Sequence, residues 1–147
     1  MTSRAVATTF GYVLTLAITT LLVSGLLIAG GNFVEDQREH VIESELEVIG
    51  EQLANQVNAA DRLVQSGQGE TTVRIEQRFP VTVTDVPYRI TLHEQERAFI
   101  QLNSTRHDVS TTVSVSNTTD VGHSRADGGS IVIEYEEEEE TVVIDNV

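Results

Sequence analysis

The chain has 147 residues, and 23 acidic residues against nine arginines and no lysine give it a formal net charge of −14. Phosphates would repel so acidic a surface, so the composition argues against a nucleic-acid-binding protein. The sequence has no cysteine, which excludes a disulfide framework, a thiolate nucleophile and cysteine-ligated zinc.

An uncharged apolar segment dominates the N-terminal part of the chain. Residues 5–34 include no Asp, Glu, Lys, Arg or His. About 20 apolar residues suffice to cross a bilayer as a helix, which is the conformation that satisfies every backbone polar group within one segment. The rest of the chain has no second long apolar segment and is too small to bury this one. We therefore predict a transmembrane helix over residues 6–34.

The residues beside this segment predict its orientation in the membrane, and its length predicts whether a signal peptidase removes it. Arg4 precedes it, and Glu35 and Asp36 follow it, which favours a cytoplasmic N-terminus and an extracellular C-terminal domain in a single-pass protein of the cell membrane. The apolar region of a secretory signal peptide has about 7–15 residues, and this segment is about twice as long. We therefore expect it to stay in the mature chain.

The start of the segment carries a resemblance to a known family. The run from Arg4 to Thr19, RAVATTFGYVLTLAIT, resembles the start of archaeal type IV pilin-like proteins, which have a class III signal peptide. The resemblance implies that a prepilin peptidase recognises Arg4 and Ala5 and cuts before Val6, leaving residues 1–5 as a short basic leader. It also implies that other pilin-like subunits are partners.

Two departures from the family pattern keep an alternative open. Ala7-Thr8 stands where the family commonly has Ser-Pro, and the fifth residue of the expected mature chain is not the Glu of bacterial pilins. The alternative is a plain bitopic anchor that is never cleaved.

An amphipathic helix is predicted to continue from the membrane segment over residues 35–66. Its polar face carries Glu43, Glu45, Glu47 and Glu51, and glycine at position 67 is a typical helix stop. The opposite face is an apolar stripe, whose residues recur at helical spacing: Ile42, Leu46, Ile49, Leu53, Val57, Ala60 and Val64. This stripe is predicted to pack either on a sheet of the same chain or on the stripes of neighbouring subunits, and both options stay open.

From residue 70 onward the apolar period changes from that of a helix to that of strands. Residues 117–129 are expected to be a loop, with its strongest turn signal at Asp127-Gly128-Gly129. A long helix followed by short strands predicts an α+β fold, with an antiparallel β domain over residues 70–147 that is pilin-like in arrangement. Six strands are predicted, at residues 71–79, 88–93, 98–103, 109–116, 130–136 and 141–145.

Five consecutive glutamates, Glu136–Glu140, form the most acidic segment. Carboxylates bind calcium when they converge with carbonyl oxygens around a sharp turn, and a run along one hairpin does not provide that geometry. We interpret the run as a solvated hairpin tip whose charges are screened by salt. The acidic, lysine-free composition as a whole is similar to that of proteins from salt-loving archaea.

Two sequons suggest surface modification. Asn103-Ser104-Thr105 and Asn117-Thr118-Thr119 both match the N-glycosylation acceptor, and each is expected at a strand end or in a loop. We hypothesise that Asn103 or Asn117 carries a glycan.

No catalytic, cofactor or metal site is predicted. The histidines at positions 40, 93, 107 and 123 have no i,i+4 spacing. His107 and Asp108 near Ser104 or Ser110 lack the surroundings of a nucleophile elbow, and no glycine-rich phosphate loop is present.

The sequence therefore predicts a structural protein rather than an enzyme. The first interpretation is a minor pilin-like subunit of an archaeal type IV pilus-like surface filament or of its assembly machinery, with membrane lipid and other pilin-like subunits as its partners. The alternative is an uncleaved bitopic membrane protein that displays an acidic, ligand- or partner-binding β domain at the cell surface.

Overall fold

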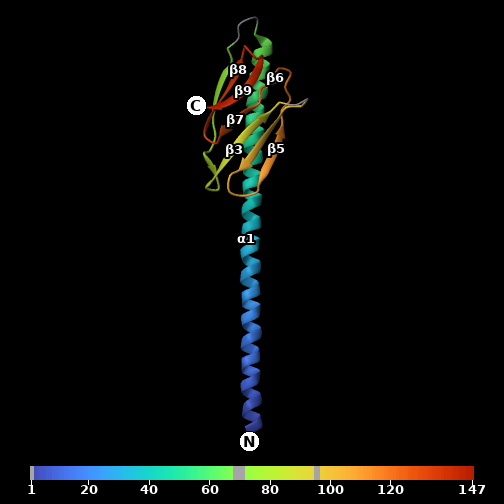
Figure 1. Cartoon of the computed structure of the whole chain (residues 1–147), viewed down its shortest axis with the longest axis vertical. Coiled ribbons are helices and arrows are strands. Elements are labelled where there is room, and N and C mark those ends of the chain that lie inside the picture. The colour runs from blue at the N-terminus through green and yellow to red at the C-terminus, as the bar shows by residue number, and fades with distance from the viewer. Residues whose placement is uncertain (1, 68–71, 95–96) are drawn as a thin grey trace. The chain divides into compact units, whose positions relative to one another are not determined.

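The computed structural model describes residues 2–67, 72–94 and 97–147, with side chains described from residue 9 onward (Figure 1). One helix, α1 (Thr2–Ser66), is followed by a β domain, so the predicted α+β fold is confirmed. The chain divides into two compact units at residues 1–38 and 39–147, and the division falls within α1. The strands are β1 (Arg74–Arg78), β2 (Thr82–Val83), β3 (Val86–His93), β4 (Phe99–Ser104), β5 (Ser110–Ser114), β6 (Asp120–Val121), β7 (Ser124–Asp127), β8 (Ser130–Glu136) and β9 (Thr141–Asn146).

The helix ends where its sequence predicts. The N–H of Gly67 donates to Leu63 O at 3.1 Å and to Val64 O at 3.2 Å, and the Ser66 hydroxyl donates to Leu63 O at 3.0 Å. These bonds satisfy carbonyls that would otherwise be orphaned at a helix C-terminus. The predicted stop after Ser66 is therefore confirmed, and residues 68–71 lie outside the described residues.

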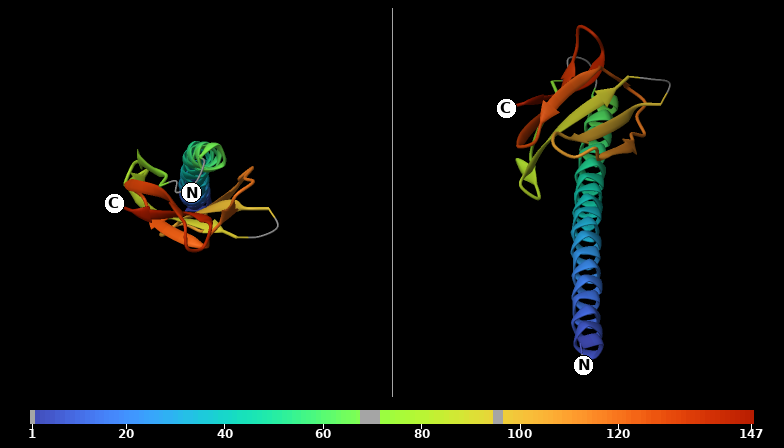
Figure 2. Two further views of the ribbon diagram at one scale, coloured as in Figure 1. Left: turned by 90° about the horizontal axis from the view of Figure 1, so that it is seen from above. Right: turned by 60° about the horizontal axis from the view of Figure 1, so that its bottom comes forward.

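The strands form two sheets that make a curved layer on one side of the helix (Figure 2). The first sheet has the order β1-β8-β9-β6, and the second has the order β2-β3-β4-β5, with β7 also paired to β3. The described strand pairs are antiparallel except β6 with β9, which is parallel. The β3–β4 pair confirms the predicted hairpin, although residues 95–96 of its turn lie outside the described residues.

The core of the second unit forms between the apolar stripe of α1 and the sheets. Ile42, Leu46, Leu53, Val57 and Ala60 have no exposed surface. They join one cluster with inward-facing strand residues such as those of β3, β4 and β8, and Val64 packs at its edge. The option in which the stripe packs on its own sheet is confirmed for this part of the helix.

A glycine permits the closest approach between helix and sheet. A Cβ atom on Gly50 would lie 2.7 Å from Val113 Cγ2 and 2.8 Å from Leu102 Cδ1. Both distances are shorter than real Cβ contacts, so the side chains of β4 and β5 occupy the space that a larger residue in α1 would need.

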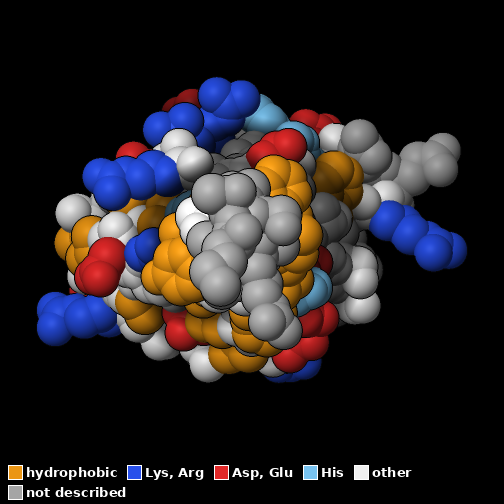
Figure 3. All heavy atoms as spheres, turned by 90° about the horizontal axis from the view of Figure 1, so that it is seen from below, with side chains coloured by type: hydrophobic (Ala, Val, Ile, Leu, Met, Phe, Trp, Pro, Cys, Tyr) orange, Lys and Arg blue, Asp and Glu red, His pale blue; other side chains and the backbone are white. Residues whose placement is uncertain are grey.

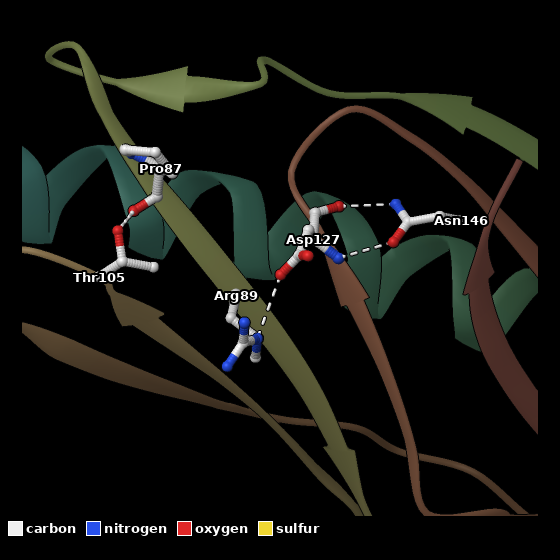
Figure 4. Close-up of polar contacts among 5 residues, drawn as sticks. All are labelled: Pro87, Arg89, Thr105, Asp127 and Asn146. Atoms are coloured by element: carbon white, nitrogen blue, oxygen red, sulfur yellow. Dashed lines mark hydrogen bonds and ion pairs between the residues drawn. The ribbon is translucent and has the colours of Figure 1, made fainter.

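Side chains join the two sheets between β7 and β9 (Figure 4). The Asn146 side chain accepts a hydrogen bond from Asp127 N–H at 2.9 Å and donates one to Asp127 O at 2.9 Å. This amide therefore pairs with Asp127 as a strand backbone would. The Ser124 hydroxyl accepts from Ile144 N–H at 3.0 Å, and Arg89 forms an ion pair with Asp127 at 3.1 Å.

The prediction that residues 117–129 are a loop throughout is wrong. This segment contains β6 and β7, whereas residues 117–119, residues 122–123 and the bend at Gly128-Gly129 lie outside strands, as predicted. In β7 the sole buried side chain is Ala126, so the strand lacks an apolar alternation that sequence could reveal. Its stability comes instead from pairing with β3 and from the contacts of Ser124 and Asp127 to β9.

Candidate functional site

The N-terminal part of α1 exposes an unusually large apolar surface. Large hydrophobic side chains from Phe10 to Val34 are between 49% and 73% exposed. Figure 3 shows that hydrophobic side chains are exposed in the view from below. An 18-residue window of this helix has a mean hydropathy of 2.2 and is not buried. Soluble monomers rarely expose contiguous apolar patches larger than a few hundred Å². By length and composition, this one helix could cross a membrane, which is compatible with a single-pass membrane protein.

Three threonine hydroxyls of this segment have partners within the helix. The side chains of Thr15, Thr19 and Thr20 donate to the carbonyls of Gly11, Thr15 and Leu16 at 2.9, 2.9 and 2.8 Å. A hydroxyl bonded to the preceding turn needs no water, so these threonines carry little desolvation cost in an apolar environment. The threonine-rich composition is therefore consistent with lipid or protein as the surroundings.

The predicted processing residues begin this helix. Arg4, Ala5 and Val6 have helical backbone within α1, but their side chains lie outside the described part of the chain. Cleavage before Val6 stays a prediction.

A groove lies beside the helix in the second unit. It has a volume of about 490 Å³ and is lined by Ser44, Glu45, Val48, Ile49, Gln52 and Pro80. Val48 is 52% exposed, and Val41 and Leu63 are also exposed, so the helix retains apolar surface away from its core stripe. The sequence gives a weak signal for this surface because single valines there alternate with charged and polar residues.

The acidic run is placed as a hairpin tip. Glu136 ends β8, Glu137–Glu140 form the turn before β9, and all five residues are exposed. Glu140 has a positive φ of 54°. This location matches the interpretation of a solvated tip.

The two sequons occupy different settings. Asn103 is the penultimate residue of β4 and is half-buried between its partners Arg89 in β3 and Ser110 in β5. Asn117 is also half-buried, in the loop before β6, and its Nδ2 donates to Thr119 O at 2.6 Å. These settings agree with the predicted strand end and loop, and glycosylation stays a prediction.

The loop that holds Asn117 is attached to α1 by a buried carboxylate. Asp61 is 4% exposed and accepts hydrogen bonds from Thr119 N–H at 2.7 Å, Thr118 N–H at 3.1 Å and the Gln65 side chain at 2.8 Å. Burial raises the pKa of Asp61, but the hydrogen bonds from Thr119, Gln65 and Thr118 outweigh it and leave the pKa below its usual value. No local sequence pattern indicates this role, because Thr118 and Thr119 are more than 50 residues away from Asp61.

Two of the residues considered for a hydrolase triad, Ser104 and His107, are joined through a backbone group. Ser104 Oγ accepts a hydrogen bond from the backbone N–H of His107 at 3.3 Å. The absence of enzymatic activity stays a prediction.

Ring contacts bring two histidines together. His93 stacks on Phe99 with ring centroids 4.6 Å apart, and the ring of His123 lies 5.3 Å from that of His93. Sequence spacing missed this pair because it forms between two strands rather than along one helix.

The fold and its exposed helix define an α+β protein in which the described residues include one candidate membrane-spanning segment, near the N-terminus. The chain belongs to a family of unknown function (DUF7266), whose model matches residues 1–145. No curated protein and no solved structure matches the chain. The family match covers both the apolar helix and the β domain.

Proposed function

We propose that this chain is a minor pilin-like structural subunit of an archaeal type IV pilus-like surface filament or of its assembly machinery. The observation that carries the proposal is the difference in burial between the two parts of α1. Its first part presents an apolar surface on all sides, and its later part packs into the β domain of the same chain. A single helix with these two properties suits a subunit that is held in a membrane and then packs against similar helices.

The proposed mechanism is structural. Before assembly, lipid covers the apolar segment of the membrane-inserted subunit. In the filament, the equivalent segments of other subunits replace this lipid. Both environments lack water, and the internal bonds of Thr15, Thr19 and Thr20 suit either. The N-terminus faces the cytoplasm and the acidic β domain faces outside, as Arg4 and the acidic residues after the segment favour.

The exposed apolar surface of the second unit supplies a further contact for this assembly. Val41, Val48 and Leu63 lie on α1 outside the core, and Val48 lines the groove with Pro80. Neighbouring subunits would cover such residues, and the mechanism requires no catalytic group.

The N-terminus of the protein from native membranes tests the proposal. We expect a mature chain that begins at Val6, and sheared surface filaments that contain it. Arg4→Gln should block cleavage and leave the precursor in the membrane. Arg62→Gln is the matched control, because Arg62 is exposed on the same helix far from the leader, and it should leave cleavage unchanged.

A native chain that keeps Met1 and Arg4 and is missing from sheared filaments would contradict the proposal. That result would instead support an uncleaved bitopic anchor that displays a binding domain.

We also propose that one or both sequons carry a glycan. The intact mass of the native protein should exceed the polypeptide mass by whole sugar residues. Asn103→Gln and Asn117→Gln, made separately, should each remove the addition that belongs to its site. A native mass equal to the bare polypeptide would exclude the modification.

A further inference from the structure

The β3–β7 register places two histidines opposite each other. The last pair of this ladder is Leu92 with Ser124, and the strands are antiparallel. The next residues along each chain, His93 and His123, therefore face each other across the strands. Directly opposed residues on neighbouring strands have Cβ atoms about 4.5–5.5 Å apart. Because side chains alternate along a strand, His93 lies on the sheet face opposite to the buried Leu92.

The ring of His93 is held in position by two neighbours. It stacks on Phe99, its register partner in β4, and its Nε2 lies 3.2 Å from Oε1 of Gln101. Donation from Nε2 to this amide oxygen leaves the lone pair on Nδ1. A metal-binding histidine characteristically uses one ring nitrogen for the ion and donates from the other to an oxygen acceptor.

The spacing of the rings suits a shared ion. A ligating imidazole nitrogen lies about 2.0–2.1 Å from Zn²⁺, which puts the ring centroid about 3.2 Å from the ion. Two such rings at a tetrahedral angle have centroids about 5.2 Å apart. The centroids of His93 and His123 are 5.3 Å apart, with the ring planes inclined by 59°. His123 is exposed, so its ring can turn toward the ion while His93 stays fixed.

We propose that His93 and His123 form a binding site for a divalent transition-metal ion of the Cu²⁺, Ni²⁺ or Zn²⁺ class. Imidazole nitrogen is a preferred ligand for these ions. His123 also lines a polar recess of about 310 Å³ that includes Glu136, Glu139 and Asp145. These carboxylates lower the cost of bringing a cation to the histidines, and Arg125, which also lines the recess, opposes them. The site is independent of the proposed filament function.

Titration of the full chain with Cu²⁺ tests the site. The protein is held in detergent micelles with molar KCl, which screens unspecific attraction to the acidic surface. Calorimetry should show one high-affinity ion per chain, and electron paramagnetic resonance of that ion should show two nitrogen ligands. His123→Gln should weaken binding by at least about tenfold, as ligand loss exceeds the effect of losing a supporting residue. His93→Gln should do the same.

Two further variants separate this site from its alternatives. His40→Gln, at a side chain that is 76% exposed on α1, should leave both affinity and spectrum unchanged. The double variant Glu136→Gln and Glu139→Gln should weaken binding less than the loss of either His93 or His123. Unchanged affinity in His123→Gln, or a spectrum with fewer than two nitrogen ligands, would overturn the proposal, while circular dichroism confirms that each variant remains folded.

Discussion

Replacing Asp61 with Asn should destabilise the β domain, because Asp61 connects the end of α1 to the loop before β6. Its carboxylate accepts from two backbone N–H groups, those of Thr119 and Thr118, at 2.7 and 3.1 Å. Asparagine has almost the same shape but only one acceptor oxygen and no charge. At least one of the two backbone donors then faces an N–H₂ group instead of an oxygen.

The expected loss is about 2 kcal/mol in the free energy of unfolding. A hydrogen bond to a charged group contributes about 1.5–3 kcal/mol, so the bond that asparagine can no longer accept accounts for a loss of about 2 kcal/mol. For a domain of about 100 residues, this corresponds to a decrease in melting temperature of roughly 8 °C.

The effect should depend on pH in a defined direction. Hydrogen bonds hold the pKa of Asp61 below its ordinary value of 3.8, so its carboxylate stabilises the fold above that pH. The stabilisation is lost as pH falls through the lower pKa of the folded state. The difference between wild type and Asp61→Asn should therefore be largest near neutral pH and should shrink below about pH 4.

The near-ultraviolet circular dichroism of the tyrosines measures this unfolding in detergent micelles, since Tyr88 and Tyr135 lie in the β domain. Glu51→Gln is the control, because Glu51 is exposed on the same helix and should change the melting temperature little. A difference between wild type and Asp61→Asn that is below 0.5 kcal/mol at pH 7, or that is equally large at pH 7 and pH 3, would refute the reasoning.

Three further predictions concern the β domain, each measured by the same melting experiment. Gly128→Ala should cost about 2 kcal/mol through overpacking, because its Cβ would lie 2.7 Å from a ring carbon of Tyr88 and 2.9 Å from Pro80 O. Asn146→Ala should cost about 1 kcal/mol, because both bonds to Asp127 are lost at an exposed position. The melting temperature should rise between dilute buffer and molar KCl, because salt screens the repulsion among the exposed glutamates at 136–140.

Each of these predictions has its own control. Gly31→Ala has open space around its new methyl group and should leave the melting of the domain unchanged; equal effects of the two glycine variants would contradict the steric argument. Asn146→Asp keeps the acceptor and loses the donor, so it should be intermediate. Replacing Glu137 and Glu138 with Gln should reduce the salt dependence, and a melting temperature that is insensitive to salt in the wild type would rule out the repulsion.

Most regular elements could be predicted because their signals are local. The stripe from Ile42 to Ala60 repeats at helical spacing, and its buried positions are those that the spacing selects. The strand predicted at residues 130–136 is β8 with the same bounds, since the apolar run of Ile131, Val132 and Ile133 follows the Gly128-Gly129 turn and all three side chains are buried.

The short strands could not be predicted because they depend on distant partners or unusual turns. β2 joins β3 through Thr84 and Asp85, which both have positive φ, of 50° and 62°. Hairpin turns of this kind favour Asn-Gly or Asp-Gly, so Thr-Asp gives no warning of one. β6 has two residues and pairs in parallel with β9, and such a pair leaves no periodic pattern.

The same limit applies to the polar side chains that matter most. Asp61, Asn146 and the pair His93 and His123 each depend on a partner from a different element. Nothing near them in sequence distinguishes Asp61 from the exposed acidic residues of α1. The helix that could span a membrane was predictable because hydrophobicity over a long segment requires no partner.

The pairing of β1 with β8 sets an order of events during synthesis. Arg74 lies opposite Glu134, which is 60 residues later in the chain. At about 5–20 residues per second, the ribosome completes this partner roughly 3–12 s after β1. The apolar helix needs only contacts within a few turns, so it can enter a membrane while the first sheet still lacks its central strands. In the orientation proposed above, the β domain would cross the membrane as an unfolded chain and fold on the far side, so its stability would not oppose its translocation.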